Sequence, residues 1–344
     1  LEGKIAAYDP ENISASPANT KTVDMTEKNE EKISYENVFA KVAQKRQLNN
    51  QEIEVFNRYN PQNAYTHNTT NTEIMIPETV IAGIMKEAQE LHPILAEVRK
   101  MAIKGNVRFI KHTGIAAGDA KYYTEAQVVE DEENKFGEIT LGGHELAKAV
   151  TVTWKLQEMA ISDFIPFIQA ELGERIGAAK AYAVVRGTGT NQPRGIITAL
   201  KAQVSTPQIK TYTTTIGYAD LTAAFAKISS EFAAGAKVYA NTSTLWNNLA
   251  NILDGQNRPI FIPDPTSGGV GRIFGKVVDV EDAMQDGEVL IGNPSKGYMM
   301  NIQDPMKLVT EQHAKGRTTD FVAYEINDGD VLAEKAFALI EKTA

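Results

Sequence analysis

The feature that most constrains this chain is a long helical pattern that runs into a glycine-rich block. Between residues 161 and 186, apolar side chains recur at spacings of three and four, and charged side chains fill the other faces. At about 1.5 Å per residue the pattern predicts a rod of roughly 35 Å. We expect Asp163 to cap its N-terminus, with Pro166 in the first turn, where a missing N–H is tolerated. The apolar stripe of this spine helix is Ile161, Ile165, Ile168, Leu172, Ile176, Ala179 and Ala183, and Phe164 is a further residue of the helix. Glu171, Glu174, Arg175 and Lys180 are expected on its other faces.

The glycine-rich block that follows, R-G-T-G-T-N-Q-P-R-G (186–195), has two interpretations. It could cradle a phosphate, or it could end the helix and form a turn. Phosphate loops run strand, loop, helix, because the positive helix N-terminus must face the anion. Gly187 and Gly189 instead follow the helix, at its negative end. We therefore expect Gly187 to be the C-terminal stop of the spine helix.

The sequence contains no recognisable catalytic or metal-binding motif. Its five histidines are far apart, and none has the spacing of metal ligands. There is no G-x-S-x-G nucleophile elbow, and the acidic run 130–133 is typical of a solvated loop. The absence of cysteine excludes disulfides and thiolate ligands. We predict no catalytic residue, no metal and no cofactor.

Charge and hydropathy exclude two further classes of protein. A net charge of −9 without a cluster of Lys and Arg argues against a dedicated nucleic-acid binder. The sequence has no run of about 18 apolar residues, so it predicts no membrane span. The first ten residues do not have the pattern of a signal peptide. The apolar content of 42% is ordinary for a globular protein.

The rest of the chain mixes strand and helix patterns and predicts an α+β fold. Residues 106–111, and an alternating run in which Val150, Val152 and Trp154 share a face, predict a long β-hairpin with a charged tip. Asp220 is expected to cap a further helix. Near the C-terminus, Asn-Asp-Gly (327–329) between alternating runs predicts a hairpin turn.

Three segments offer surface that a single copy cannot bury. A long isolated hairpin is marginally stable in water. Residues 1–75 have too little apolar sequence to form a core of their own. The Gly/Pro-rich loop 254–272 is long for a compact domain. We therefore expect a homo-oligomer in which residues 1–75 extend over neighbouring copies. On this view, deleting residues 1–60 weakens or abolishes the assembled particles and leaves the globular part soluble.

The order of these parts resembles the major capsid proteins of tailed bacteriophages, which have the Hong Kong 97-like fold. The resemblance covers residues 74–344 and rests on three stretches. One is "FGKVVDV" and "EVLIGN", preceded by Arg258-Pro259, and another is the C-terminal "DFVAYEINDGDVLAEKAFALI". The most specific is a strand and a spine helix followed by the pattern G-x-G-x-x-x-P-x-G-I, formed by Gly187, Gly189, Pro193, Gly195 and Ile196.

The resemblance implies a division of the chain into the parts of that fold. They are an N-terminal arm (1–75), a first P-domain part (76–103), the E-loop hairpin arm (104–150), the P-domain with the spine helix (151–217), the A-domain (218–304) and the C-terminal P-domain strands (305–344).

The function implied is that of a major capsid protein, which self-assembles into pentamers and hexamers of an icosahedral phage head. The head encloses double-stranded DNA without sequence specificity. Portal, scaffolding, protease and decoration proteins are implied partners, and the implied location is the virion, after assembly in the bacterial host cytoplasm. Two alternatives stay open: an encapsulin-type nanocompartment shell, and a soluble enzyme with an unrecognised site. The acidic hairpin and the long arm favour the phage head.

Two groups of residues are expected at subunit contacts. Aromatic side chains are enriched at such contacts. The hairpin is expected to cross onto an adjacent subunit through Tyr122, Tyr123, Glu130, Asp131, Lys135 and Phe136. The Gly/Pro-rich loop is expected near a ring axis through Asp254, Arg258, Pro259 and Arg272.

The resemblance also raises two questions about covalent processing. Some relatives join subunits by an isopeptide bond between an E-loop Lys and a P-domain Asn, assisted by a Glu. Lys135 could supply the amine, but the other two positions fall near Tyr324 and Val331, so we expect non-covalent contacts only. Residue 1 is Leu and not Met, which agrees with removal of an upstream scaffolding segment.

Overall fold

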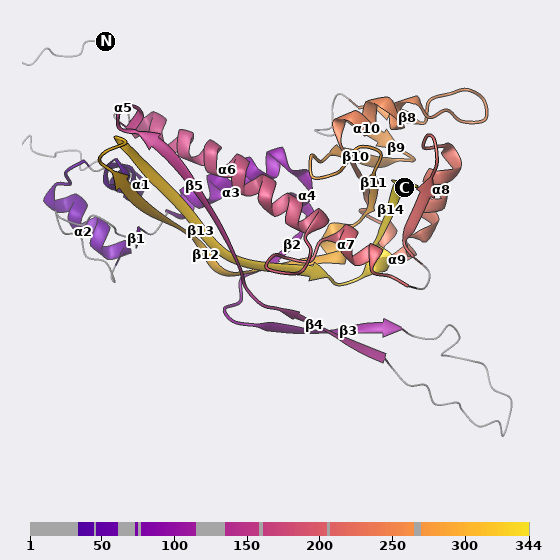
Figure 1. Cartoon of the computed structure of the whole chain (residues 1–344), viewed down its shortest axis with the longest axis horizontal. Helices are drawn as coiled ribbons and strands as arrows, with labels where there is room; N and C mark the ends of the chain where they lie inside the picture. The colour runs from indigo at the N-terminus through magenta and orange to yellow at the C-terminus, as the bar shows by residue number, and fades with distance from the viewer. Residues whose placement is uncertain are drawn as a thin grey trace, which may run out of the picture.

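Two β-sheets and one long helix organise the chain (Figure 1). The computed structural model describes residues 34–44, 46–60, 73–74, 77–114, 135–157, 161–204, 207–264 and 270–343. The helices are α1 (Tyr35–Ala43), α2 (Asn50–Tyr59), α3 (Glu78–Leu91), α4 (Pro93–Glu97), α5 (Trp154–Gln157), α6 (Ile161–Arg186), α7 (Ile196–Lys201), α8 (Tyr218–Lys227), α9 (Ser230–Ala233), α10 (Thr242–Asn247) and α11 (Pro294–Gly297), with 3-10 turns at Leu249–Asn251 and Glu334–Ala336.

The first sheet, here called the long sheet, runs beside α6 along the body (Figure 1). Its main strands pair antiparallel in the order β1-β12-β13-β5, and β2 joins β12 in parallel. The strands are β1 (Glu73–Ile74), β2 (Arg99–Met101), β5 (His144–Thr153), β12 (Tyr298–His313) and β13 (Thr318–Val331).

The spine helix α6 covers one face of the long sheet, and α3 packs along α6. Of the predicted stripe, Ala179 is exposed, whereas Ile168, Leu172 and Ile176, together with Phe164, are at most 3% exposed. These four share one core with Val150 and Val152 of β5 and with Phe321 of β13. Because alternate strand residues point to the same side of a sheet, this core follows from the period of two in β5 and β13.

The second sheet has seven strands in the order β6-β14-β11-β7-β10-β9-β8 and forms the lobe at the right of Figure 1. Buried aliphatic residues of its central strands belong to two hydrophobic cores. One core includes residues of α8, and the other includes residues of α4 and α7. The strands are β6 (Ile209–Tyr212), β7 (Lys237–Ala240), β8 (Phe261–Pro263), β9 (Gly271–Ile273), β10 (Lys276–Val280), β11 (Val289–Gly292) and β14 (Phe337–Lys342).

The chain crosses between the two sheets in a way that differs from the expected domain ranges. Strand β5 pairs with β13 over its whole length, so residues 144–150 belong to the long sheet and not to the hairpin arm. Strand β12 begins at Tyr298 and also lies in the long sheet, whereas β14 returns to the seven-stranded sheet. These pairings join residues far apart in sequence, which local patterns do not encode.

The predicted hairpin turn at Asn-Asp-Gly (327–329) is wrong, because β13 passes straight through these residues. Asn327 and Asp328 are 3% and 7% exposed, and their side chains bond within the subunit. Gly329 lies so close to Tyr298 that an added Cβ would stand 2.7 Å from its Oη. The turn between β12 and β13 falls at residues 314–317, where Arg317 has a φ of 52°.

Three predicted ends of helices and strands also differ from those in the structure. Helix α6 already includes Ile161, so Asp163 lies in its first turn and is not the cap, and Pro166 lies inside the helix. Helix α8 starts at Tyr218, and Asp220 instead accepts a hydrogen bond from the Gly217 N–H at 3.0 Å. Trp154 begins α5 and is 38% exposed, so it does not continue the inward face of β5.

The expectation that residues 1–75 lie only over neighbouring copies is wrong for residues 35–60. Helices α1 and α2 pack on their own subunit, and Phe39 and Phe56 are buried in the same core as Phe164. Asn49 stabilises α2 with a capping box, in which its side chain accepts from the Glu52 N–H at 2.8 Å. The sequence did not predict the core that these two helices complete.

This packing reverses one expectation and gives a first prediction. Deleting residues 1–60 is now expected to unfold the subunit. Phe39→Ala alone should lower the free energy of unfolding by about 3–5 kcal/mol, because it leaves a cavity in a filled core. Leu91→Ala, at a residue that is 45% exposed on α3, is the control and should change it by no more than about 0.5 kcal/mol. Urea denaturation measures both; equal effects would contradict the shared core.

Candidate functional site

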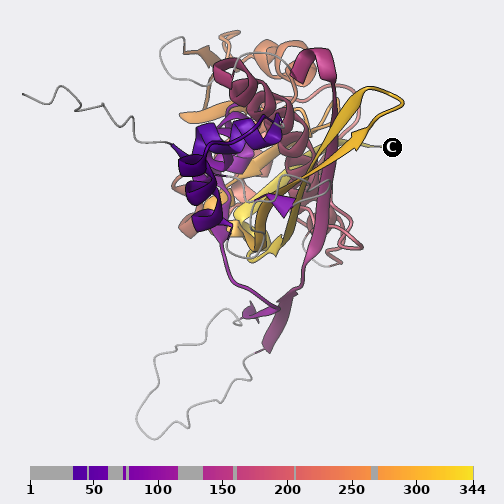
Figure 2. The ribbon, with the colours of Figure 1, turned by 90° about the vertical axis from the view of Figure 1, so that its left-hand side faces the viewer.

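The β3–β4 hairpin projects from the body as a separate two-stranded sheet (Figures 1 and 2). Strands β3 (Val107–Gly114) and β4 (Lys135–Leu141) pair with each other and with no other described strand. Among its described residues, those at the base are anchored, through Ile139 and Leu141 against Met299 of β12. A two-stranded ribbon gains little stability by itself. This hairpin is therefore a candidate surface for contact with another chain.

The contact residues expected on the hairpin are only partly described by the structure. Lys135 and Phe136 begin β4, opposite Gly114 and His112. Tyr122, Tyr123, Glu130 and Asp131 lie outside the described residues. The intersubunit role of all six stays a prediction.

The loop residues expected at a ring axis form two separate groups. Asp254 holds a tight turn by accepting hydrogen bonds from the Gln256 N–H (2.8 Å), the Arg258 N–H (2.9 Å) and the Arg258 guanidinium (3.0 Å). These bonds, led by those from the two backbone N–H groups, lower the pKa of Asp254. Pro259 forms an isolated β-bridge with Leu253 beside this turn. Arg272 lies on β9 and pairs with Asp264 at 3.3 Å. Their place relative to a ring axis stays a prediction.

The glycine-rich block after α6 is a turn, and its glycines allow two backbone segments to touch. The Gly195 N–H donates to the Gly187 carbonyl at 2.8 Å. A Cβ on Gly187 would stand 2.0 Å from the Pro193 oxygen, and one on Gly195 would stand 2.4 Å from the Gly187 nitrogen. Gly189 and Asn191 are the left-handed residues of this turn, with φ of 78° and 56°. Gly187 therefore ends the helix by close approach of the returning chain, and not as a left-handed cap.

A buried ion pair joins α6 to the long sheet. The Lys180 Nζ donates to Glu325 Oε2 at 2.7 Å, and the two side chains are 2% and 4% exposed. The other carboxylate oxygen accepts from Asn327 Nδ2 at 3.0 Å. Burial lowers the pKa of nearby Lys100, and the positive charge of Lys180 acts in the same direction. The pair fixes which face of α6 meets β13.

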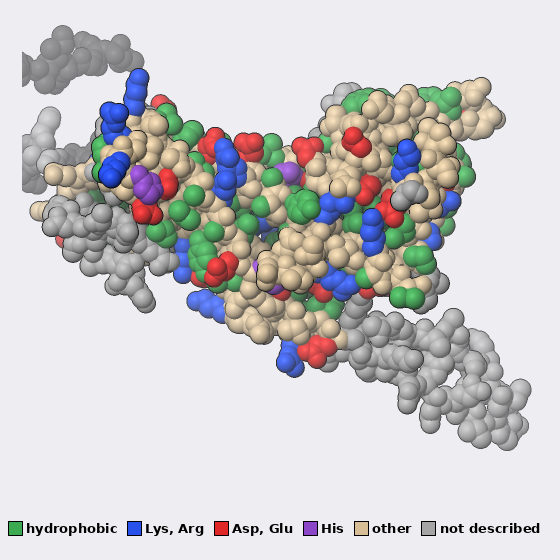
Figure 3. Space-filling view, viewed as in Figure 1, with side chains coloured by type: hydrophobic (Ala, Val, Ile, Leu, Met, Phe, Trp, Pro, Cys, Tyr) green, Lys and Arg blue, Asp and Glu red, His purple; other side chains and the backbone are tan. Residues whose placement is uncertain are grey.

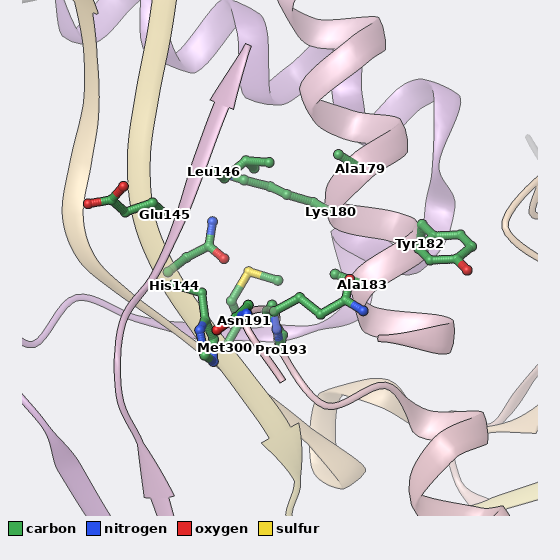
Figure 4. A pocket seen from close by; sticks show the side chains of 12 residues that line it. His144, Glu145, Leu146, Ala179, Lys180, Tyr182, Ala183, Asn191, Pro193 and Met300 are labelled. Carbon is green, nitrogen blue, oxygen red and sulfur yellow. The ribbon is translucent and has the colours of Figure 1, made fainter. Parts of the chain in front are cut away.

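A cleft of about 310 Å³ opens beside this pair, between α6, β5 and the turn after α6. In Figure 4 the Lys180 side chain extends from α6 towards the strands, whereas Tyr182 points away from them. The cleft is lined by His144, Glu145, Leu146, Ala179, Lys180, Tyr182, Ala183, Asn191, Gln192, Pro193, Met300 and Asn327.

Two polar contacts connect the helices of the long sheet to the seven-stranded lobe. At the α3–α4 junction, His92 Nδ1 lies 2.7 Å from Glu281 Oε1, which follows β10. The bond to the Glu281 carboxylate raises the pKa of His92, although burial opposes it. At the end of α6, Arg186 pairs with Glu288 and donates to the Ala283 carbonyl at 3.0 Å. These contacts fix the orientation of the lobe relative to the spine.

Sequence reasoning missed these buried charges. Lys180 was placed among the charged residues of the outer faces, and His92 was not singled out. One signal was available: Glu325 is two residues from Ala323 and four from Phe321, so the alternation of β13 turns its side chain inward. A carboxylate on the inward face requires a partner.

The described residues show no arrangement suited to a metal or a membrane. Among them, no three His, Asp or Glu side chains gather as a potential metal site. No helix in the described part of the chain is long and apolar enough to cross a bilayer.

Comparison with known proteins identifies similar chains. The model of the Phage capsid family matches residues 72–342. The capsid of a native GTA particle aligns with a TM-score of 0.56 at 18% identity, covering 75% of this chain and 91% of that chain. Mycobacterium phage Bobi aligns at 0.52 and 14%, covering 87% and 99%. An encapsulin complex from Synechococcus elongatus aligns at 0.50 and 11%, covering 73% and 88%. A search of curated protein sequences gave no match.

Proposed function

Because the chain belongs to the phage capsid family, we propose that its copies assemble through pentamers and hexamers into a closed icosahedral shell around double-stranded DNA. The chain is a major capsid protein, with a structural and not an enzymatic role, and its location is the capsid of the virion. The α+β, Hong Kong 97-like fold expected from the sequence is confirmed.

The projecting β3–β4 hairpin is the observation that most supports assembly. Its described residues carry two strands away from the subunit core and contact the body at the base of the hairpin. Surface that is marginal in one copy becomes stable when a second copy covers it. The hairpin therefore corresponds to the E-loop, and its contact with an adjacent subunit is part of this proposal.

The two sheets correspond to the other parts of the fold. We assign the long sheet with α3 and α6 to the P-domain, and the seven-stranded sheet to the A-domain. Helices α1 and α2 are part of the P-domain core, so the N-terminal arm is shortened to the residues before α1. The turn that contains Asp254 and Arg258 belongs to the A-domain and is proposed to face a ring axis.

The proposed cargo is double-stranded DNA held by confinement. The net charge of −9 supports packaging without sequence-specific contacts, since phosphate binding needs clustered cations. Assembly in a bacterial cytoplasm, with portal, scaffolding, protease and decoration proteins as partners, is part of the same proposal. An encapsulin-type shell with an enzyme cargo is the second candidate, supported by the structural likeness to an encapsulin complex.

Electron microscopy of the purified chain tests this function. We expect closed shells with five-fold vertices, because contacts between two different surfaces close into rings. Particles from a producing culture, treated with nuclease and then opened, should release double-stranded DNA. A stoichiometric second protein in place of DNA would favour the encapsulin-type shell. A chain that stays monomeric at all concentrations would contradict both.

A further inference from the structure

The β3–β4 hairpin is joined to the body by two short connections. Residues 102–106 connect β2 to β3, and Gly142 and Gly143 connect β4 to β5. Figure 3 shows basic and acidic side chains on the described part of the hairpin, below the body, and its pair of Arg108 and Glu138 is exposed. Exposed pairs contribute little, and the apolar packing at the hairpin base is not directional. The direction of the hairpin therefore depends on hydrogen bonds at the two connections.

Asn301 of β12 holds the first connection. Its Oδ1 accepts a hydrogen bond from the Ile103 N–H at 3.0 Å, and its Nδ2 donates to the Ile103 carbonyl at 3.0 Å. Asn301 is 0% exposed, whereas Ile103 is 41% exposed. Strand β2 ends at Met101, which is the strand partner of Asn301. The Asn301 amide has the same donor and acceptor groups as a peptide unit, so it continues this pairing beyond the end of the strand.

Asp328 of β13 holds the second connection. Its Oδ2 accepts a hydrogen bond from the Gly142 N–H at 2.7 Å, and its Oδ1 accepts one from the Gly329 N–H at 2.7 Å. The same Oδ1 lies 3.6 Å from His144 Nε2, and Asp328 is 7% exposed. A hydrogen bond to a carboxylate is stronger than one between neutral groups. The bond from Gly142 therefore fixes the point at which the chain returns to the body.

The two side chains that hold the connections are neighbours. Asn301 and Asp328 lie directly opposite each other in the pairing of β12 with β13, and opposite residues of paired strands point to the same side of a sheet. The returning chain also runs close to both strands, because a Cβ on Gly143 would stand 2.0 Å from Gln303 Oε1 and 2.6 Å from Ile326 Cγ2. One place on the long sheet thus holds both connections of the hairpin.

We propose that Asn301 and Asp328 form a clamp that sets the direction of the hairpin in the single subunit. This role accounts for the buried Asp328 inside a strand, where Asp is depleted. The consequence for assembly rests on the proposed function. A hairpin that is already oriented loses less conformational freedom when it contacts the next copy of the chain.

Distances between two spin labels test the clamp in the unassembled subunit. Because the chain has no cysteine, labels can be attached at Arg108→Cys on β3 and Glu90→Cys on α3, both of which are exposed. The unaltered clamp should give one narrow distribution of distances. Asn301→Leu, which has a similar volume but makes neither bond, should roughly double the width of this distribution, because the connection becomes a hinge. Asp328→Ala should have the same effect.

Gly142→Ala is the matched control for the two clamp variants. It keeps the N–H that Asp328 binds, and the added Cβ would lie 3.9 Å from Asp328 Oδ2, an ordinary contact distance. The width of the distribution should therefore not change. The clamp variants, unlike this control, should also raise the concentration needed for half-maximal assembly several-fold. Light scattering measures that concentration.

Hydrogen exchange in the unaltered subunit is a second test that needs no variant. The N–H groups of Ile103 and Gly142 should exchange roughly ten times more slowly than those of the exposed residues Lys104 and Gly105, because a bonded N–H exchanges only when its bond opens. This measurement decides the proposal if a clamp variant does not fold.

Three outcomes would overturn the proposal. If both clamp variants keep the narrow distribution, the apolar base alone sets the direction. If Gly142→Ala widens the distribution equally, the effect is not specific to the bonds. If the N–H groups of Ile103 and Gly142 exchange as fast as their exposed neighbours, the bonds are not kept in solution. By contrast, an unaltered chain that forms no shells would contradict the proposed function and leave the clamp standing, since the clamp is measured on the single subunit.

Discussion

Replacing residues 111–137 by Asn-Gly is expected to abolish closed shells and to leave the subunit folded. Ile110 and Glu138 are direct partners in the hairpin, so a two-residue turn can join them without changing the register. The shortened chain keeps Ile139 and Leu141, which anchor the hairpin base on Met299. Of the residues it loses, 111–114 and 135–137 pair only with each other among the described strands, and 115–134 lie outside the described residues. No member of the described cores is removed, whereas assembly is expected to lose a contact.

Electron microscopy and thermal melting measure the two halves of this prediction. The shortened chain should form no shells at concentrations at which the unaltered chain assembles. Its subunit should melt within about 2 °C of the unaltered subunit, which for a chain of this length corresponds to a change of roughly 1 kcal/mol. Arg108→Gln, which removes only the exposed pair with Glu138, is a matched control that should assemble normally. Normal shells from the shortened chain would exclude the hairpin as an essential contact.

The elements that the sequence predicts well are those with a local cause. The spacing of Ile168, Leu172 and Ile176 identifies the inner face of α6, because a helix places residues three and four apart on one side. The alternation of Val150 and Val152 likewise identifies the inner face of β5. Both signals depend on the side-chain period of the element itself, so no tertiary information is needed.

The predictions that failed are those in which tertiary contacts override a local preference. Asn-Asp-Gly favours a turn, yet Asn327 and Asp328 find buried partners and Gly329 admits Tyr298, so the strand continues. The actual turn ends at Arg317, a residue with no strong turn preference. Pairing of β5 with β13 was also not predictable, because strand partners distant in sequence leave no local pattern.

The sequence predicts candidate surfaces that lie on one continuous segment, but not those formed by two distant segments. The hairpin was identified by its alternating strand pattern, and the loop near Asp254 by its length and its Gly and Pro content. The ring contacts of Phe274 with Tyr218 and Phe225 were not identified, because these residues come together only when α8 packs beside the β9–β10 turn. Surface made by two distant segments requires the fold before it can be recognised.

The buried pair of Lys180 and Glu325 leads to the second large expected effect. Both charges are almost fully removed from water, and their mutual attraction together with the bond from Asn327 offsets the cost of that removal. Lys180→Met keeps the length of the side chain but leaves the Glu325 carboxylate buried without its cation. We expect the free energy of unfolding to fall by about 3–5 kcal/mol, as for other broken buried pairs. Chemical denaturation of the unassembled subunit measures it.

A double variant separates the cost of an unpaired charge from the value of the pair. In Lys180→Met with Glu325→Gln, the buried charge is gone and the Gln oxygen can still accept from Asn327. The double variant should therefore recover more than half of the stability lost in the single variant, a coupling typical of residues in contact. Arg175→Met breaks the exposed Glu171–Arg175 pair on the same helix and should cost no more than about 1 kcal/mol. If the double variant is as unstable as Lys180→Met alone, the loss comes from packing at position 180 and not from an uncompensated charge, and the ion pair does not fix α6 on the sheet.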